Sequence, residues 1–298
     1  MRTLYLGSSD FAVMVLRALA ASEHRPALVL TRPDRPRGRG QRLAPGPVAV
    51  AARELGLECV QPERPEAPQA LEAIEAAGVE AACVCAYGAI LREPLLSARR
   101  LYNVHPSLLP RWRGAAPIER AIMAGDRETG VCIMRPVAEL DAGPVALSRA
   151  EPIAAQDTYG TLGGRLAKAG AQLLIDALDG DPELREQDPS GATYAEKISA
   201  QDRWLEPRRP AIELDRMVRA LSPHVGARLR LADGGVLGVR AARLLEARAP
   251  EAPAAAGELT EVDDRLVLGC GQGALELCEV QPSGGRPMPV AAYLRGHR

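Results

Sequence analysis

Short, almost continuously apolar segments alternate with amphipathic segments through the first half of the chain, and this alternation constrains the fold more than any other feature. Residues 2–7 form an apolar run that ends at Gly7, and the apolar spacing after Asp10 is that of a helix. Further strands are predicted at residues 27–31 and 81–85 and at a segment ending with 103–105, and helices at 48–55, 68–77 and 116–123. Strands buried on both faces read as continuous apolar runs. The pattern therefore predicts a doubly wound, mostly parallel, Rossmann-like α/β domain.

The alternation of strands and helices ends with a hairpin and a long helix, and the sequence pattern changes beyond residue 187. Residues 131–137 and 145–152 predict a hairpin that ends the sheet, and a long helix is expected over 159–178. Beyond residue 188, turn-forming residues lead to one helix at 212–221 and to short strand-like segments, which indicate a small antiparallel, OB-like β-barrel. At about 150 residues per domain the length also suggests two domains. The expected division is a catalytic domain at 1–187, a linker at 188–208 and the barrel domain at 209–298.

The net charge, the spacing of the cysteines and the lengths of the apolar runs limit what kind of protein this chain can be. Thirty-seven Lys and Arg against 38 Asp and Glu leave a net charge of −1, so any contact with RNA must be local. The six cysteines lack zinc-ligand spacing and are expected to be reduced core residues, and no metal site is expected. The chain lacks a signal-peptide pattern and an apolar run of about 20 residues, so a cytoplasmic location is expected.

Two polar residues lie at the end of the strand that finishes at 103–105. Asn103 and His105 alternate on that strand, so both side chains project from one face of its tip, ahead of a proline-bounded segment. In open α/β sheets, ligands bind outside the carboxyl ends of the strands. The residues alone also fit a capping asparagine and a core histidine before a structural proline loop.

The longer segment Asn-Val-His-Pro-Ser-Leu-Leu-Pro-Arg-Trp-Arg-Gly-Ala-Ala-Pro, residues 103–117, closely resembles the signature of the formyltransferases that use 10-formyltetrahydrofolate. Asp141, within Glu-Leu-Asp-Ala-Gly-Pro, resembles the family's second signature. The resemblance implies that Asn103 donates to the formyl oxygen and that His105 is a second donor or a proton relay. It implies that Asp141 orients His105 or a water and accepts the proton.

The same resemblance implies a site for the folate co-substrate, which arrives as 10-formyltetrahydrofolate and leaves as tetrahydrofolate. The folate site would be lined by Ser107, Leu108, Leu109 and Pro110. The pterin edge would be read by the backbone of Tyr87, Gly88, Ala89, Ile90 and Leu91. Two departures stand out: Ala89 replaces a bulky apolar residue, and Ser8 and Ser9 replace the expected Thr-Pro.

An arginine-rich segment at residues 33–48 resembles the inserted loop of the family branch that formylates methionyl initiator tRNA, where it contacts the tRNA acceptor arm. The resemblance implies tRNA contacts by Arg37, Arg39 and Arg42, and it also implies that the barrel domain at 209–298 binds tRNA. Five arginines within residues 32–42, interleaved with Gly and Pro, make a mobile basic loop suited to binding phosphates. We call this segment, residues 33–48, the arginine-rich hook. The composition alone also fits a generic solvated loop.

The implied reaction is transfer of a formyl group from folate to the α-amino group of methionyl initiator tRNA, by a protein expected to be a monomer. Three alternatives remain: a formyltransferase acting on an amino sugar nucleotide, a catalytically silent RNA-binding protein, and a folate hydrolase that releases formate. The amino sugar enzyme should lack the arginine-rich hook. The silent protein would not need Asn103, His105 and Asp141 together, and the hydrolase usually carries extra domains.

Overall fold

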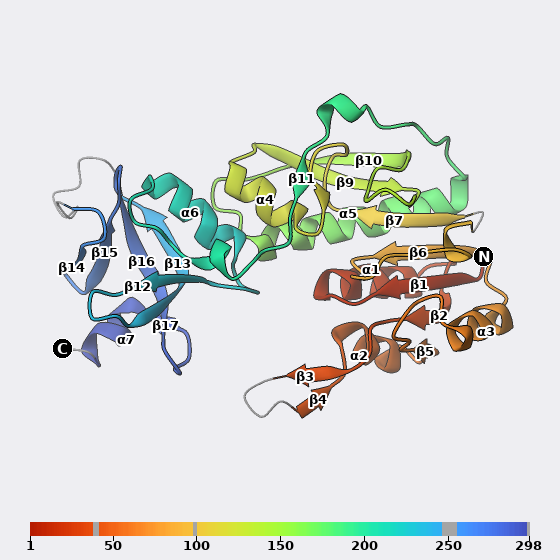
Figure 1. Ribbon diagram of the computed structural model, residues 1–298, viewed down its shortest axis with the longest axis horizontal. Coiled ribbons are helices and arrows are strands. Elements are labelled where there is room, and N and C mark those ends of the chain that lie inside the picture. The colour runs from red at the N-terminus through yellow and green to blue at the C-terminus, as the bar shows by residue number, and fades with distance from the viewer. Residues whose placement is uncertain (38–41, 98–99, 246–254, 297–298) are drawn as a thin grey trace. The chain divides into compact units, whose positions relative to one another are not determined.

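The computed structural model describes residues 1–37, 42–97, 100–245 and 255–296, and the chain forms two compact units (Figure 1). The first unit contains residues 1–117, 128–152 and 163–196. The second contains residues 118–127, 153–162 and 197–298. No helix among the described residues is both long and apolar enough to cross a membrane.

The first unit is built on a seven-stranded sheet. Its strand order is β10–β9–β7–β6–β1–β2–β5, and the five strands from β7 to β5 are parallel. The last two strands, β9 and β10, form an antiparallel hairpin at one edge. The strand bounds are β1 (Thr3–Gly7), β2 (Pro26–Leu30), β5 (Cys59–Val60), β6 (Ala81–Cys85), β7 (Leu101–His105), β9 (Glu128–Met134) and β10 (Val145–Pro152). The predicted mostly parallel α/β sheet is confirmed.

Helices α1 (Asp10–Ala20), α2 (Pro47–Glu54) and α3 (Pro68–Ala77) lie in the connections between these strands, and α5 (Tyr159–Gly180) follows β10. Helix α1 begins where the sequence predicts it, because the Ser9 side chain accepts a hydrogen bond from the Ala12 N–H and caps the first turn. On one side of the sheet, leucines of β1 and β2 pack with the small residues of α3. Burial raises the pKa of the Cys83 and Cys85 thiols to about 12, so both remain protonated core residues.

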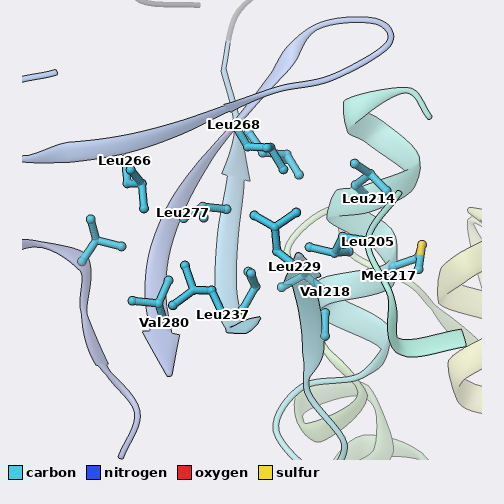
Figure 2. Close-up of a cluster of buried hydrophobic side chains, with 14 of the residues drawn as sticks. Leu205, Leu214, Met217, Val218, Leu229, Leu237, Leu266, Leu268, Leu277 and Val280 are labelled. Carbon is cyan, nitrogen blue, oxygen red and sulfur yellow. The ribbon is translucent and has the colours of Figure 1, made fainter. Parts of the chain in front are cut away.

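The second unit holds a separate antiparallel sheet in the order β12–β13–β16–β15–β14, with β17 paired to β16. Its bounds are β12 (Ala227–Arg230), β13 (Val236–Leu244), β14 (Leu259–Val262), β15 (Arg265–Gly269), β16 (Ala274–Pro282), β17 (Met288–Pro289), α6 (Ala211–Ala220) and α7 (Val290–Arg295). Figure 2 shows its core, in which leucine and valine side chains of the strands meet the buried face of α6. The antiparallel β architecture predicted for this half is confirmed.

Helix α4 (Pro117–Ala124) belongs mainly to the second unit, although it lies between strands of the first in sequence. Met123 packs against the core shown in Figure 2, and Arg120 forms an ion pair with Asp202 at 3.0 Å. Burial alone would raise the pKa of Asp202, but hydrogen bonds from Arg120 and Ser199 outweigh it and lower this pKa to about 2. The pairing therefore ties α4 to the start of the C-terminal sequence at neutral pH.

Two short paired strands form part of the arginine-rich hook. Strand β3 (Arg35–Arg37) pairs antiparallel with β4 (Arg42–Ala44), so a short ribbon carries residues 38–41, which lie outside the described residues. Nothing in the alternation of polar and apolar residues marks these strands, because each is only three residues long and β3 consists of arginine and proline. The expectation of a loop therefore missed the ribbon.

Candidate functional site

Asn103 lies at the carboxyl end of β7, between β6 and β9, where it pairs in register with Val84 and Met134. Its side chain is half-buried, and its Nδ2 lies 3.7 Å from the Met134 Sδ. A thioether sulfur is a weak acceptor. The amide N–H groups therefore have no strong acceptor among the described residues and remain available to a substrate oxygen.

His105, two residues further on, is buried, with 4% of its surface exposed, and its ring is fixed by the backbone. Its Nε2 lies 2.9 Å from the carbonyl oxygen of Trp112. A carbonyl can only accept, so Nε2 carries the proton and donates this bond. The other ring nitrogen, Nδ1, faces the Oδ2 of Asp141 at 3.7 Å. The ring is thus oriented with its basic nitrogen toward the carboxylate.

Asp141 comes from the connection between β9 and β10. Its backbone has φ 49°, a left-handed conformation that Asp adopts more readily than most residues. Its Oδ2 accepts a hydrogen bond from the Gly114 N–H at 2.8 Å. The amide of Gln187 donates to the carbonyl oxygens of Asp141 at 2.8 Å and of Gly143 at 2.6 Å. These bonds hold the carboxylate in place beside His105.

Gly143 has to be glycine for this turn to form. A Cβ there would lie 1.9 Å from the Arg135 carbonyl oxygen, a separation that no backbone adjustment of a few tenths of an ångström would relieve.

Gln187, which holds the backbone of Asp141, is itself held by Arg113. The buried Arg113 side chain donates to the Gln187 Oε1 through Nε at 3.1 Å and Nη2 at 2.9 Å. Sequence reasoning missed Gln187 and the backbone groups of Trp112 and Gly114.

The proline-bounded segment after β7 turns back on itself. The hydroxyl of Ser107 is fully buried and donates to the Arg111 carbonyl oxygen at 2.6 Å, and the Leu109–Pro110 peptide is cis. The Ser107 side chain thus shapes the loop from within. Leu108, Leu109 and Pro110 line a cavity of about 470 Å³ together with residues 145–148 of β10 and with residues 182–183 and 185–188.

The second predicted folate segment lies at the end of β6. Ser8 donates from its hydroxyl to the carbonyl oxygens of Ala86 and Tyr87, both at 2.9 Å. Ala89 and Leu91 pack on the core beside α3, whereas Ile90 is 73% exposed. The local shape is thus fixed mainly through the backbone.

Tyr87 and Gly88 line a different cavity, of about 500 Å³, with Ser8, Thr31, Arg32 and Arg35. The Tyr87 hydroxyl is buried without a hydrogen-bond partner among the described residues, and burial raises its pKa to about 12. The structure therefore places the two predicted folate segments on two separate cavities.

Of the predicted tRNA-binding residues, Arg37 ends β3 and Arg42 begins β4, and the two are paired in register. The Arg42 side chain is exposed, and Arg39 lies outside the described residues. The base of the ribbon is anchored by Gln61, whose amide donates to the Asp34 Oδ1 at 2.6 Å and to the Arg32 carbonyl oxygen at 3.0 Å. The hook therefore rises from a fixed base.

Comparison with known proteins assigns the chain to one family. The family model described as formyl transferase matches residues 1–178, and that of the formyl transferase C-terminal domain matches residues 197–298. A methionyl-tRNA formyltransferase from Cereibacter sphaeroides is 45% identical over 300 residues, which cover 99% of this chain and 96% of that protein.

Two solved structures share the fold at low sequence identity. HypX from Aquifex aeolicus in complex with tetrahydrofolic acid has a TM-score of 0.68 and 18% identity, covering 99% of this chain and 47% of its own. An N-formyltransferase from Helicobacter canadensis, in complex with folinic acid and dTDP-3-aminofucose, has a TM-score of 0.65 and 14% identity, covering 93% of this chain and 98% of its own. The much higher identity to the Cereibacter protein, over nearly the full length of both chains, shows that this chain belongs to the methionyl-tRNA formyltransferase family.

Proposed function

We propose that this protein transfers the formyl group of 10-formyltetrahydrofolate to the α-amino group of methionyl initiator tRNA. The observation that carries the proposal is the placement of His105 and Asp141, 3.7 Å apart, beside Asn103 at the end of β7, in a chain of this family. A folate co-substrate is further supported by the tetrahydrofolate-bound neighbour of the same fold. Formylmethionyl-tRNA serves translation initiation, so the reaction belongs in the cytoplasm.

The reaction is acyl transfer between two amines. The lone pair of the methionyl nitrogen attacks the formyl carbon, a C–N bond forms, and the formyl oxygen becomes an oxyanion. When the bond to the folate nitrogen breaks, that nitrogen takes up a proton, and the attacking nitrogen loses one. The protein must therefore stabilise the oxyanion and move a proton between two nitrogens.

Asn103 supplies the oxyanion donor in this proposal, because its amide N–H groups meet only a weak sulfur acceptor. A preorganised donor of this kind stabilises charge that develops in the transition state at no reorganisation cost. No side-chain nucleophile is required, since the amine itself attacks.

His105 relays the proton through Nδ1. Nε2 is committed to the Trp112 carbonyl, so Nδ1 is the nitrogen that takes up and releases a proton. Asp141 stabilises the imidazolium form, because its Oδ2 lies opposite that nitrogen. The Gly114 N–H and Gln187 keep the carboxylate in position during the exchange.

For the folate, we propose that residues 107–110 and the backbone of residues 87–91 provide the binding surfaces. They follow β7 and β6, neighbouring strands of the sheet. Asn103 and His105 lie on β7 itself. We propose residues 1–187 as the catalytic domain, 188–208 as a linker and 209–298 as a tRNA-binding domain, in a monomeric enzyme without a metal.

The hook is proposed to bind the acceptor arm through Arg37, Arg39 and Arg42. Arg39→Ala should raise the KM for methionyl initiator tRNA by about 10-fold or more, the loss expected for one charge-assisted phosphate contact. Affinity for tetrahydrofolate should stay unchanged. Steady-state kinetics with tRNA as the varied substrate, beside folate titration, measure both, and an unaltered KM would remove Arg39 from the tRNA site.

The proposed activity itself is tested by incubating the protein with 10-formyltetrahydrofolate carrying a labelled formyl group and with methionyl initiator tRNA. Label should appear as formylmethionine after the ester is hydrolysed. Release of free formate without transfer would instead favour a folate hydrolase.

A further inference from the structure

A short segment of the proposed linker pairs with the loop that follows β7. Strand β11 (Tyr194–Ala195), labelled in Figure 1, pairs parallel with β8 (Arg113–Gly114), and both strands belong to the first unit. The carbonyl oxygen of Ala195 accepts a hydrogen bond from the Ala115 N–H at 2.8 Å. A Cβ at Gly114, whose φ is 116°, would lie 2.7 Å from that same oxygen. The two backbones therefore approach so closely that position 114 requires glycine.

Trp112, immediately before β8, has a backbone conformation that needs support. Its φ is 63°, in the left-handed region that a bulky side chain rarely adopts. Such a conformation persists only where the surrounding structure fixes it. The Trp112 carbonyl oxygen is also the acceptor, at 2.9 Å, for the Nε2 proton of His105. The position of this carbonyl therefore decides which ring nitrogen of His105 carries the proton.

Thr193, directly before β11, binds the N–H edges of both peptide groups that flank the Trp112 Cα. Its Oγ1 accepts from the Trp112 N–H at 2.9 Å, and its carbonyl oxygen accepts from the Arg113 N–H at 2.8 Å. A trans peptide is planar, with its N–H and C=O on opposite sides. The peptide that presents the Trp112 carbonyl to His105 is therefore held at its other edge by Thr193.

The preceding peptide group is held at both edges as well. Its N–H, that of Trp112, binds the Thr193 Oγ1, and its carbonyl oxygen, that of Arg111, accepts from the Ser107 hydroxyl at 2.6 Å. Of the two acceptors that Thr193 supplies, only Oγ1 belongs to a side chain and can be removed by substitution. Without this bond the two peptide groups can rotate about the Trp112 Cα, and the carbonyl moves away from the His105 ring.

We propose that Thr193 is a positioning residue for formyl transfer, an inference that rests on the proposed function. By fixing the Trp112 carbonyl, it keeps the proton of the neutral ring on the His105 Nε2. The Nδ1 lone pair then faces Asp141 and is ready to take up a proton. Residues 193–195 thus act as part of the catalytic centre, although they lie in the sequence proposed as a linker.

The test compares variants of the full-length protein. Thr193→Val keeps the β-branched shape and removes the oxygen that accepts from the Trp112 N–H, whereas Thr193→Ser retains that oxygen. The matched control Tyr194→Phe removes a hydroxyl from the next residue, whose side chain is exposed. Thermal unfolding checks that each variant folds, and Thr193→Ala removes the same oxygen if the valine variant does not fold.

Thr193→Val should lower kcat for transfer to methionyl initiator tRNA by about 10- to 100-fold, the loss found when the outer partner of a ligand histidine is removed. The KM for each substrate should stay within about threefold, because no substrate contact is lost. Thr193→Ser should lose less than about threefold in kcat, since its hydroxyl still accepts the bond, and Tyr194→Phe should be unchanged. Equal losses in the valine and serine variants, or no loss in the valine variant, would overturn the inference.

The tautomer of His105 gives a second readout that needs no substrate. The chain has four histidines, so their nitrogen-15 ring signals can be assigned by comparison with His105→Gln. At about pH 8.5, where an ordinary imidazole is neutral, the unaltered protein and Thr193→Ser should carry the proton on Nε2, and Thr193→Val should shift it in part to Nδ1. A lower rate with an unchanged tautomer would overturn the inference, because Thr193 would then only support the fold. If the unaltered protein transferred no formyl group, the proposed function would fail, while the tautomer would still decide whether Thr193 orients His105.

Discussion

Asp141→Asn should lower the rate of formyl transfer by between about 100-fold and 10,000-fold, the range for loss of a proton-transfer group, while the affinity for tetrahydrofolate stays within about threefold. Asparagine keeps the size of the side chain, tolerates φ 49°, and retains an oxygen that accepts from the Gly114 N–H. What it removes is the negative charge opposite His105 Nδ1. Single-turnover transfer and equilibrium folate binding separate these two effects.

A matched control is Glu139→Gln, which removes a carboxylate two positions away in the same connection. The Glu139 side chain is 70% exposed and its contact with Arg113 is 3.4 Å long, so the rate should fall less than about threefold. If Asp141→Asn reduced binding and turnover equally, Asp141 would be a structural residue and not the partner of a proton relay.

Asn103→Ala should slow the transfer step by about 100- to 1000-fold, the usual effect of removing one oxyanion donor. The loss should appear in kcat, because the donor acts on charge that develops in the transition state. Stability should change little, since the 3.7 Å contact with the Met134 sulfur is the only one that the amide N–H groups make with an acceptor in the described part of the chain. Rates with saturating folate and tRNA measure the effect directly.

Met134→Leu tests whether that sulfur contact is what matters. Leucine has a similar volume, so the core is preserved at a cost below about 1.5 kcal/mol. The Asn103 amide would remain but lose its sulfur neighbour. A rate loss as large as that of Asn103→Ala would show that Asn103 acts by packing against β9, contrary to its assignment as a donor.

Much of the first unit could be predicted from the sequence because local pattern and final burial agree there. Helix α3 and strand β6 have the predicted bounds, since a proline starts the helix and β6 is apolar throughout and buried throughout. Strand β14 and helix α7 were not predicted, because each is short and lacks a clear apolar period. Such elements form only when tertiary packing supports them.

Within the candidate site, the side chains could be predicted but not the groups that orient them. Asn103 and His105 follow from alternation at a strand end. The Trp112 carbonyl and the Gly114 N–H carry no sequence signal, because every residue has a backbone donor or acceptor. Gln187 lies 46 positions from Asp141, and only the packing of residues 182–188 beside β10 brings it there.

The central claim is most directly tested by transfer of labelled formyl from 10-formyltetrahydrofolate to three acceptors in parallel: methionyl initiator tRNA, methionyl elongator tRNA and an amino sugar nucleotide. The proposed function predicts rapid transfer to the initiator tRNA and little to the other two. Transfer to the sugar nucleotide alone would leave the roles of Asn103, His105 and Asp141 intact but contradict the tRNA substrate. Absence of transfer to all three would contradict the enzymatic function itself.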